Sequence, residues 1–369
     1  MNQLFRWDQM GLFLLALAAG ILPFAVPEVC AAALREGLTL CSGPLLLSLF
    51  PFLVVSRLLI QCPESDLLAL PFRLAAWGIG IRTLCAARVL CIGFLGGFAP
   101  AASAAAQAVR TGQLTAEEAD ALLPACICSG PSFVVLTVGQ SLLGSAELGV
   151  LLFASQITAN YLTAALLNRF AGVRSVKPGS AAPASPAPPR LDEILADAAI
   201  TYCKLCGFIL FFRMLAAGAG ALLPAGAGTL CAVLLEVCSG CDLASRTGRW
   251  GSLLCCAALS VQGLSVLLQV RTICPPEMTL RPLYRSRLLH LPLSLALFYL
   301  LLPGGEADVF STLPARVLLM RRVPPDCALL VFAVCCMAAC TLRSGIRQVE
   351  QKQMARNAGG CCINSKTLL

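Results

Sequence analysis

The stretch VLCIGFLGGFAPAASAAAQAV, residues Val89 to Val109, decides the fold. It is long and apolar enough to lie at membrane depth, yet Gly93, Gly96, Gly97 and Pro100 stand in its middle, where a plain lipid-facing anchor would carry leucine and isoleucine. Broken backbone inside a bilayer is tolerated only where protein or a watery cavity satisfies the freed N–H and C=O groups. The stretch therefore predicts a broken membrane helix that lines a binding cavity or a transport pathway.

The composition of the whole chain agrees with a membrane setting. Hydrophobic residues make up 58%, charged residues only 12%, and the mean hydropathy is +0.82, which is typical of a polytopic helical membrane protein. The net charge of +8 comes from basic residues in short segments between apolar runs and in the C-terminal tail, as the positive-inside rule requires. No basic block is interleaved with aromatic residues, so we expect a lipid bilayer and no nucleic acid as partner.

The 21 cysteines fall mostly inside apolar runs, where they act as small packing residues. Two CxxC pairs, Cys203/Cys206 and Cys238/Cys241, carry little weight because roughly one such spacing arises by chance at this density. A single histidine, His290, leaves little material for mixed ligation or a catalytic triad. We therefore expect no metal, no cofactor and no enzymatic activity.

Apolar runs, loops and composition shifts divide the chain. The predicted units are an N-terminal membrane helix and loop (1–42), a first repeat (43–170), a Pro/Ala-rich linker (171–190), a second repeat (191–303), a loop and last membrane helix (304–342) and a basic tail (343–369). The eight predicted crossings are 10–26, 43–60, 89–109, 148–167, 198–223, 253–270, 288–302 and 327–342.

Three interrupted segments lie between these crossings. Residues 62–87 predict a re-entrant hairpin or an interfacial amphipathic helix, and 124–144 predict a kinked crossing or a second re-entrant hairpin. The segment 224–242 is short and bounded by glycine and proline. Before 124–144, Thr115-Ala-Glu-Glu predicts a capping box that starts a helix.

The two halves repeat one order. Ser48 to Ile60 corresponds to Gly207 to Ala219, and in each half a short interrupted segment follows. Then GFLGGFAPAASAAAQ is aligned with ALSVQGLSVLLQV, and a span with polar residues closes each half. If 62–87 and 124–144 re-enter without crossing, the charge bias of the loops predicts that the halves are inverted and that both termini are cytoplasmic. If 124–144 crosses instead, the charges fit the positive-inside rule less well.

Four segments resemble a known family: SLFPF (Ser48 to Phe52), Gly93 to Phe133, LLEVCSG (Leu234 to Gly240) and SVQGLSVLLQV (Ser260 to Val270). They are similar to the sporulation integral membrane protein YlbJ family, whose nucleoside-recognition or Gate domains are similar to the core of concentrative nucleoside transporters. The resemblance implies a helix, hairpin, broken helix and helix, repeated in inverted form, with substrate between hairpin tips and broken helices. It also implies a role in spore formation, with dipicolinate moved across the forespore membrane.

The chain departs from this family at one position that bears on the substrate. Members carry Gly-aromatic-Pro-x-Gly-Ala-Lys where this chain has Gly97 to Ser103, so the lysine is replaced by Ser103. If that lysine pairs with an anionic substrate, this chain must use Arg57 or Arg213 instead.

The candidate site follows from the two broken segments and the segment that ends in Glu236. An intramembrane acid is a functional candidate by default, and coupling to a proton or cation would need one; the alternative is a hairpin-end acid bonded to backbone or to Arg213. Freed N–H groups at the breaks would bind anionic oxygen, and serines would supply hydroxyl groups. The predicted solute-binding residues are Gly96, Gly97, Ser103, Gln107, Ser129, Ser132, Glu236, Ser239, Ser260, Gln262, Gly263, Ser265 and Gln269.

The sequence is compatible with three functions. The leading hypothesis is a transporter-like membrane protein that moves a small polar or anionic solute. The second is a structural or assembly protein of spore maturation that retains the fold without transport, and the loss of the lysine favours it. The third is a nucleoside-type permease.

Overall fold

The computed structural model describes residues 2–61, 66–172 and 190–302. The predicted linker at 171–190 lies almost wholly outside these ranges, and the predicted segments 304–342 and 343–369 lie wholly outside them. Across the described ranges the chain is helical and has no strand, in agreement with the predicted all-α class.

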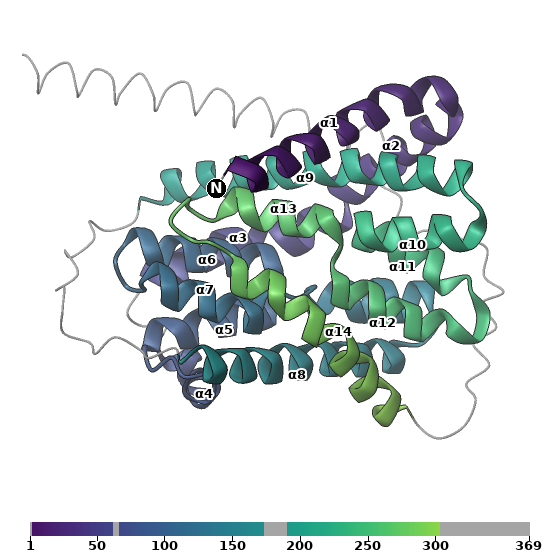
Figure 1. The fold of residues 1–369 in the computed structure, drawn as a ribbon. Coiled ribbons are helices and arrows are strands. Elements are labelled where there is room, and N and C mark those ends of the chain that lie inside the picture. Colours follow the sequence, from purple (N-terminus) through teal and green to yellow (C-terminus); the bar gives the residue numbers. More distant parts are fainter. Residues whose placement is uncertain (1, 62–65, 173–189, 303–369) are drawn as a thin grey trace, which may run out of the picture.

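Most helices are short, and several end where another begins (Figure 1). Their order is α1 (Asn2–Ala25), α2 (Pro27–Ser42), α3 (Pro44–Gln61), α4 (Asp66–Gly78), α5 (Leu84–Gly96), α6 (Phe98–Arg110), α7 (Ala116–Cys126), the π-helix η2 (Ser132–Leu142), α8 (Ala146–Ala171), α9 (Leu191–Leu222), α10 (Ala225–Leu235), α11 (Val237–Ser245), the single 3₁₀ turn η3 (Gly248–Trp250), α12 (Gly251–Val261), α13 (Gly263–Ile273) and α14 (Arg281–Leu301).

The described residues include four helical stretches long and apolar enough to cross a membrane: Pro27–Leu47, Ala146–Ala171, Leu191–Leu222 and Gly248–Ile273. The surface pattern agrees with lipid as solvent. On α8, for example, Gln156 and Asn160 face the protein interior, whereas Leu166 and Phe170 are exposed. Buried polar and exposed apolar side chains on one helix are typical of a membrane protein.

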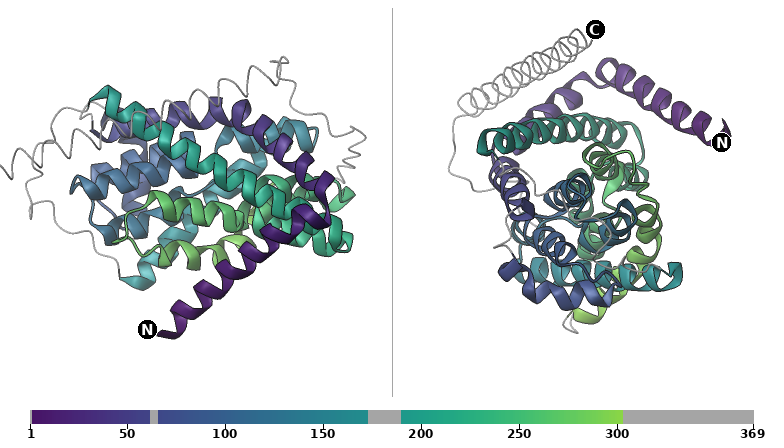
Figure 2. Two further views of the ribbon diagram at one scale, coloured as in Figure 1. Left: turned by 90° about the horizontal axis from the view of Figure 1, so that it is seen from above. Right: turned by 90° about the vertical axis from the view of Figure 1, so that its left-hand side faces the viewer.

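The N-terminal region differs from the prediction. Residues 27–42 were expected to be a loop, but they form helix α2, with Pro27 in its first turn. Proline is favoured at this position because its missing N–H group has no partner there anyway. Helix α2 packs on α9, where a Cβ atom on Gly37 would lie 2.8 Å from the side chain of Leu210. By contrast, α1 projects from the bundle at an angle (Figure 2).

The stretch from 89 to 109 is not a crossing broken by a kink, as the sequence predicted, but a helical hairpin. Helices α5 and α6 reverse direction at Gly97, and a Cβ atom on Gly93 would lie 3.2 Å from the Cβ atom of Ala101. Gly93 and Ala101 are eight residues apart and would be separated by about 12 Å in a continuous helix, so their contact requires the chain to reverse. The two outer ends of the hairpin also meet, because Arg88 and Gln113 donate to the same carbonyl, that of Ile60, at 3.1 and 3.3 Å. We call α5 and α6 hairpin 1.

Residues 225–245 form a second hairpin, α10 and α11, which we call hairpin 2. The chain reverses at Glu236, and a Cβ atom on Gly240 would lie 2.8 Å from the Cα atom of Val233. Gly220 of α9 lies beside both outer ends of this hairpin, near Gly228 of α10 and Leu243 of α11.

Residues 124–144 do not fold back on themselves, so the re-entrant alternative, on which the charge argument rested, differs from the structure, and the kinked alternative agrees with it. Helix α7, residues 127–131 and η2 together run antiparallel to α8. Along this pair, Asn168 donates to the carbonyl of Ala121 at 3.1 Å, and Asn160 donates to that of Ile127 at 3.3 Å. Near the other end of α8, a Cβ atom on Gly149 would lie 2.7 Å from the Cα atom of Val135. We call this segment broken helix 1.

Helices α12 and α13 form a second interrupted segment, broken helix 2, with its break at Gln262. Its first arm, α12, packs on α14, where the Sγ atom of Cys256 donates to the carbonyl of Ser294. Its second arm, α13, instead contacts the loop before α14, where Arg271 donates to the carbonyl of Met278 at 2.6 Å. The predicted partner of the 253–270 segment was the 89–109 stretch. The two segments differ in form: 89–109 is a hairpin, as 225–245 is, whereas 253–270 contains an interruption without a hairpin, as 116–142 does.

The two hairpins lie at opposite ends of the bundle (Figure 1). Hairpin 1 is toward the left end and hairpin 2 toward the right end, while α9 runs along one side from end to end. In residues 62–87, the remaining ambiguous segment, the structure describes 66–87: helix α4, a turn and the start of α5. Helix α4 exposes Leu67, Leu74 and Trp77, which agrees with the interfacial-helix alternative.

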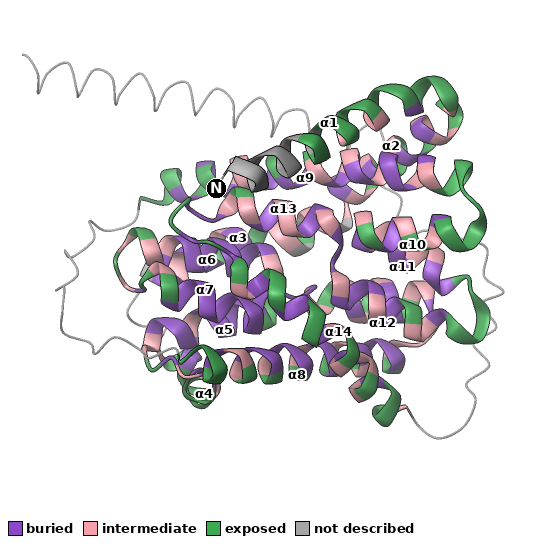
Figure 3. Ribbon diagram, viewed as in Figure 1, coloured by how far each residue is buried: buried purple, intermediate pink, exposed green. Residues whose placement is uncertain are grey.

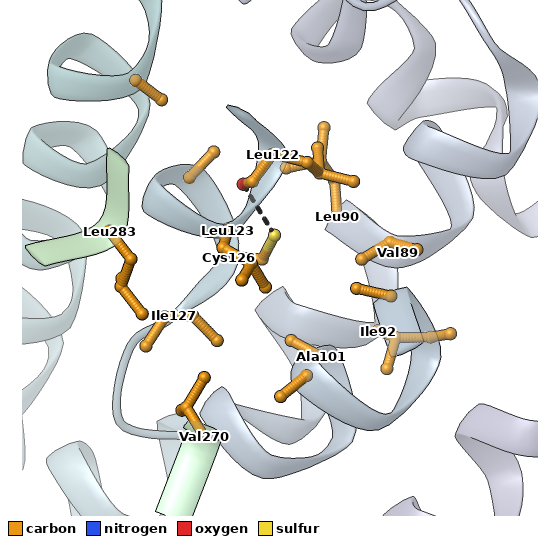
Figure 4. Close-up of a cluster of buried hydrophobic side chains, with 14 of the residues drawn as sticks. Val89, Leu90, Ile92, Ala101, Leu122, Leu123, Cys126, Ile127, Val270 and Leu283 are labelled. Atoms are coloured by element: carbon orange, nitrogen blue, oxygen red, sulfur yellow. Dashed lines mark hydrogen bonds between the residues drawn. The ribbon is translucent and has the colours of Figure 1, made fainter. Parts of the chain in front are cut away.

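A core of small and branched side chains holds the hairpins between the longer helices. Figure 4 shows Val89 and Ala101 of hairpin 1 in one cluster with Leu122 of α7, Val270 of α13 and Leu283 of α14. Buried residues are concentrated in α5, α6 and α7, whereas the described side chains of α1, from Met10 on, are largely exposed (Figure 3). Hairpin 1 and the first arm of broken helix 1 are therefore the segments that protein surrounds most completely.

Candidate functional site

The reversals of both hairpins and the interruptions of both broken helices meet in the middle of the bundle. A Cβ atom on Gly97 would lie 2.6 Å from the backbone nitrogen of Gly130, in the interruption of broken helix 1. In the same way, a Cβ atom on Gly263 would lie 3.0 Å from the backbone nitrogen of Glu236. Each hairpin tip thus packs on the break of the broken helix that follows it in sequence.

A cavity of about 50 Å³ lies at this meeting point, and we call it the central cavity. Five predicted site residues line it: Gly96, Ser129, Ser132, Glu236 and Gln269. Side chains of α3 and α9 close its sides. The remaining lining residues are Leu45, Leu49, Phe98, Gly130, Phe133, Ile209, Val237, Cys238 and Val266.

Three helices begin beside the cavity, whereas two end there, α5 at Gly96 and α10 directly before Glu236. Helices α6, η2 and α11 all begin beside it, at Phe98, Ser132 and Val237. The first N–H groups of a helix have no partner within the helix, and the helix dipole adds positive potential there. The wall therefore favours negative charge.

Glu236 already supplies one such charge at the start of α11. Its carboxylate accepts hydrogen bonds from the backbone N–H groups of Cys238 and Ser239 at 2.8 and 2.7 Å, and from the Ser239 hydroxyl at 2.9 Å. Both predicted roles of Glu236 thus have support in the geometry: it caps the tip of hairpin 2, and it lines the cavity. Ser239 acts here by holding this carboxylate.

Two glutamines of broken helix 2 have buried amide oxygens without a hydrogen-bond partner. Gln262, in the left-handed conformation at φ +65°, leaves its Oε1 unpaired, and so does Gln269. The Nε2 of Gln269 donates to the Ser265 hydroxyl at 3.0 Å. If either amide were rotated by 180°, its oxygen and nitrogen would exchange places, and one of these two atoms would still have no hydrogen-bond partner. Gln269, on the cavity wall, is thus ready to bond a solute.

Ten predicted residues do not line the cavity. Six of them lie at or near the tips and breaks: Gly97, Ser239, Ser260, Gln262, Gly263 and Ser265. The other four have different surroundings. Ser103 is buried within α6, and Gln107 lies ten residues beyond the hairpin tip, or about 15 Å along the helix. Arg57 forms an ion pair with Asp197 at 2.6 Å. Arg213 forms one with Glu36 at 2.7 Å, although it is also close enough to Glu236 for the two charges to interact.

A buried polar network beside the cavity was not predicted as a unit. The hydroxyl of Ser260 and the Nδ1 of His290 are 2.5 Å apart, and the Nε2 of His290 lies 3.2 Å from the carbonyl oxygen of Gln156. Arg287, one turn before His290 on α14, donates to the Ser260 carbonyl and to the Oδ1 of Asn160. The predicted crossing 288–302 began directly after Arg287 and so left this residue outside the membrane. Arg287 and His290 are three residues apart and therefore lie on one helix face, and this spacing could have indicated that Arg287 is buried.

Metal-binding groups do not cluster in this region. Within the part of the chain that the structure describes, no three His, Cys, Asp or Glu side chains come together in a way that could hold a metal ion.

Comparisons with protein-family models, with curated proteins and with solved structures find no match to the chain. The functional argument therefore depends on the geometry of the central cavity.

Proposed function

We propose that this chain is a multi-pass, non-enzymatic membrane protein with the architecture of a transporter, which binds a small polar solute in the central cavity. One observation carries the proposal: two hairpin tips from opposite ends of the bundle and two broken helices converge on one cavity. In membranes, broken helices at the interface of repeated units are typical of solute sites in secondary transporters.

The proposed topology has eight crossings, with both termini on one side. They are α1, α2 with α3, broken helix 1, α8, α9, broken helix 2, α14 and the predicted span 327–342, which lies outside the described residues. The two hairpins then re-enter from opposite sides, as inverted repeats require. Arg88, Arg110, Arg169, Arg190 and Arg281 fall at the end that the positive-inside rule assigns to the cytoplasm.

The mechanism follows from the size of the cavity and the position of the tips. A cavity that holds benzene measures about 150 Å³, so the central cavity, at about 50 Å³, is closed to ring-sized solutes in this conformation. Separation of hairpin 1 from its broken helix would open the cavity to one side, and separation of hairpin 2 would open it to the other. By the resemblance, the solute is dipicolinate at the forespore membrane, or a nucleoside, with a proton or cation as coupling ion.

The alternative is a structural or assembly protein of spore maturation that keeps this fold without moving solute. Two observations favour it: the carboxylate of Glu236 is already used to cap α11, and the cavity is small. Flux measurements separate the two functions, because the alternative permits none.

The test is uptake of labelled dipicolinate and labelled uridine into vesicles containing the purified full-length chain. We expect saturable uptake of at least one solute, reduced at least tenfold by Glu236→Gln, because glutamine keeps an acceptor for the α11 cap but loses the negative charge. Asp242→Asn is the matched control: this acid lies on the same hairpin but pairs with Arg246 at a partly exposed site. Absence of flux for both solutes, with the protein folded, would favour the assembly function.

A further inference from the structure

Arg287 differs from the other buried arginine in the described part of the chain. Arg57 has a carboxylate partner, Asp197, at 2.6 Å. Arg287 has only neutral partners: the Ser260 carbonyl at 3.4 Å, the Oδ1 of Asn160 at 3.2 Å and the Ser286 hydroxyl at 3.3 Å. None of the ion pairs among the described residues includes it.

A buried guanidinium without a counter-charge is costly, and at membrane depth it is a functional candidate. Partial compensation comes from two helix ends. Ser260 lies in the last turn of α12, and Asn160 bonds the carbonyl of Ile127 directly after α7. Each helix C-terminus carries about half a negative charge. The bonds are nevertheless longer than the roughly 2.7–2.9 Å of charge-assisted hydrogen bonds, so much of the positive charge remains available.

The central cavity lies within reach of this charge. Asn160, which accepts from Arg287, donates to the carbonyl of Ile127, two residues before Ser129 on the cavity wall. Another partner of Arg287, Ser260, stands two residues before Gln262. The one acid on the wall, Glu236, is bonded at the start of α11 and interacts with Arg213 instead. The interior thus holds a positive charge behind the wall that no described carboxylate neutralises.

We propose that Arg287 determines the charge of the solute: it makes the central cavity favour an anionic carboxylate over a neutral molecule of the same shape. The inference rests on the proposed function, since it concerns the same cavity. Arg287 acts through the low-dielectric protein and not by direct contact. It adds to the helix N-termini on the wall and supplies a positive charge that Ser103 does not.

The test uses two probes that differ in charge and hardly in shape, nicotinate and nicotinamide, in equilibrium binding to the purified full-length chain. The readout is the ratio of their dissociation constants, which does not depend on the fraction of protein that is folded. We expect the wild type to prefer nicotinate and Arg287→Met to lower this preference by about ten- to twentyfold. Two unit charges about 10 Å apart, at an effective dielectric constant of about 20, would produce a ratio of this size.

Two further variants make the test specific. Arg287→Lys keeps the charge and should keep most of the preference, whereas a purely structural role of the guanidinium would make it resemble Arg287→Met. Arg57→Met removes the other buried arginine and should leave the ratio unchanged. A wild type without preference, or an unchanged ratio in Arg287→Met, overturns the inference. If uridine uptake persists in that case, the transport proposal stands; if the wild type binds neither probe and moves neither labelled solute, both proposals fail.

Discussion

Replacement of Gly97 by alanine tests the contact on which the central cavity depends. Gly97 has φ +81° and ψ −163°, a region that side chains other than glycine rarely adopt. Strain of this kind costs about 1–3 kcal/mol. The new Cβ atom would also lie 2.6 Å from the nitrogen of Gly130 and 2.9 Å from its Cα atom, both backbone atoms that cannot rotate away. Overpacking of this kind costs about 1–3 kcal/mol more, so we expect a total loss of roughly 2–6 kcal/mol.

Alanine substitutions at two other glycines distinguish the cost of backbone strain from the cost of the steric clash. Gly112 has φ +70° but no atom within 4 Å of the place that an alanine Cβ would take, so Gly112→Ala should cost only about 1–2 kcal/mol of backbone strain. Gly207 lies on the exposed face of α9 with open space around it and ordinary helical backbone. Alanine is favoured over glycine in a helix by up to about 1 kcal/mol, so Gly207→Ala should be neutral or stabilising.

The assay is the apparent melting temperature of the purified protein in detergent, at one heating rate because unfolding of such proteins is commonly irreversible. The expected order of stability is Gly207→Ala, wild type, Gly112→Ala and then Gly97→Ala. If Gly97→Ala melts no lower than Gly112→Ala, hairpin 1 does not touch broken helix 1 and the central cavity is not closed as described.

Two further substitutions test other contacts by the same melting assay. Gly240→Ala should cost about 1–3 kcal/mol by overpacking, because its Cβ atom would lie 2.8 Å from the backbone of α10, whereas Gly226→Ala, in open space on the same hairpin, should not destabilise; equal effects would contradict the reversal at the tip. Asp120→Asn should cost about 1.5–3 kcal/mol, because the carboxylate accepts three hydrogen bonds from the loop before α14, at 2.6, 2.8 and 3.1 Å. The exposed Glu117→Gln is its control, and a difference of less than 0.5 kcal/mol, roughly the effect of an ordinary surface change, would show that this clamp is absent.

Local sequence signals predicted the helices well, because they depend on neighbours in the chain. The capping box at Thr115 is confirmed: its hydroxyl accepts from the N–H group of Glu118, whose carboxylate accepts from the N–H group of Thr115. The all-helical class and several apolar stretches follow from composition alone. The loop expected at 27–42 was wrong because Pro27 was treated as the end of one helix, although proline is equally suited to begin the next.

The shape of the break at Gly97 could not be predicted from its neighbours. A kink and a full reversal both need glycine, and the choice between them depends on what packs against the two arms. Here Gly93 and Ala101 are small enough for the arms to touch, and Cys126 of α7 fills the remaining space beside Gly93. These are tertiary contacts, so the sequence identified the position of the break but not its direction. This error also misaligned the two halves of the chain.

Only part of the site was predicted, because the direction of the chain after each break depends on tertiary contacts. Gly96, Ser129, Ser132, Glu236 and Gln269 lie at breaks or close behind them, and the structure brings all five to the cavity. Gln107 was included because it ends a run that looks like the one ending in Gln269. A reversal carries the end of α6 away from the centre, whereas α13 starts at its break and keeps Gln269 within two turns of it.

In both proposed repeats a hairpin tip contacts the break of a helix, but the chemical groups at this contact differ between the two repeats. The contact between tip and break in the first is made by Gly97 and Gly130, which offer only backbone groups. In the second it is made by Glu236 and Gly263, next to Gln262, so a carboxylate and an amide stand at the equivalent place. If both repeats take part in opening the cavity, the second supplies its carboxylate and its amide, whereas the first supplies the hydroxyls of Ser129 and Ser132 and the close backbone contact that must separate. Substitutions in hairpin 2 should therefore change which solute is bound, while those at Gly97 should change how readily the cavity opens.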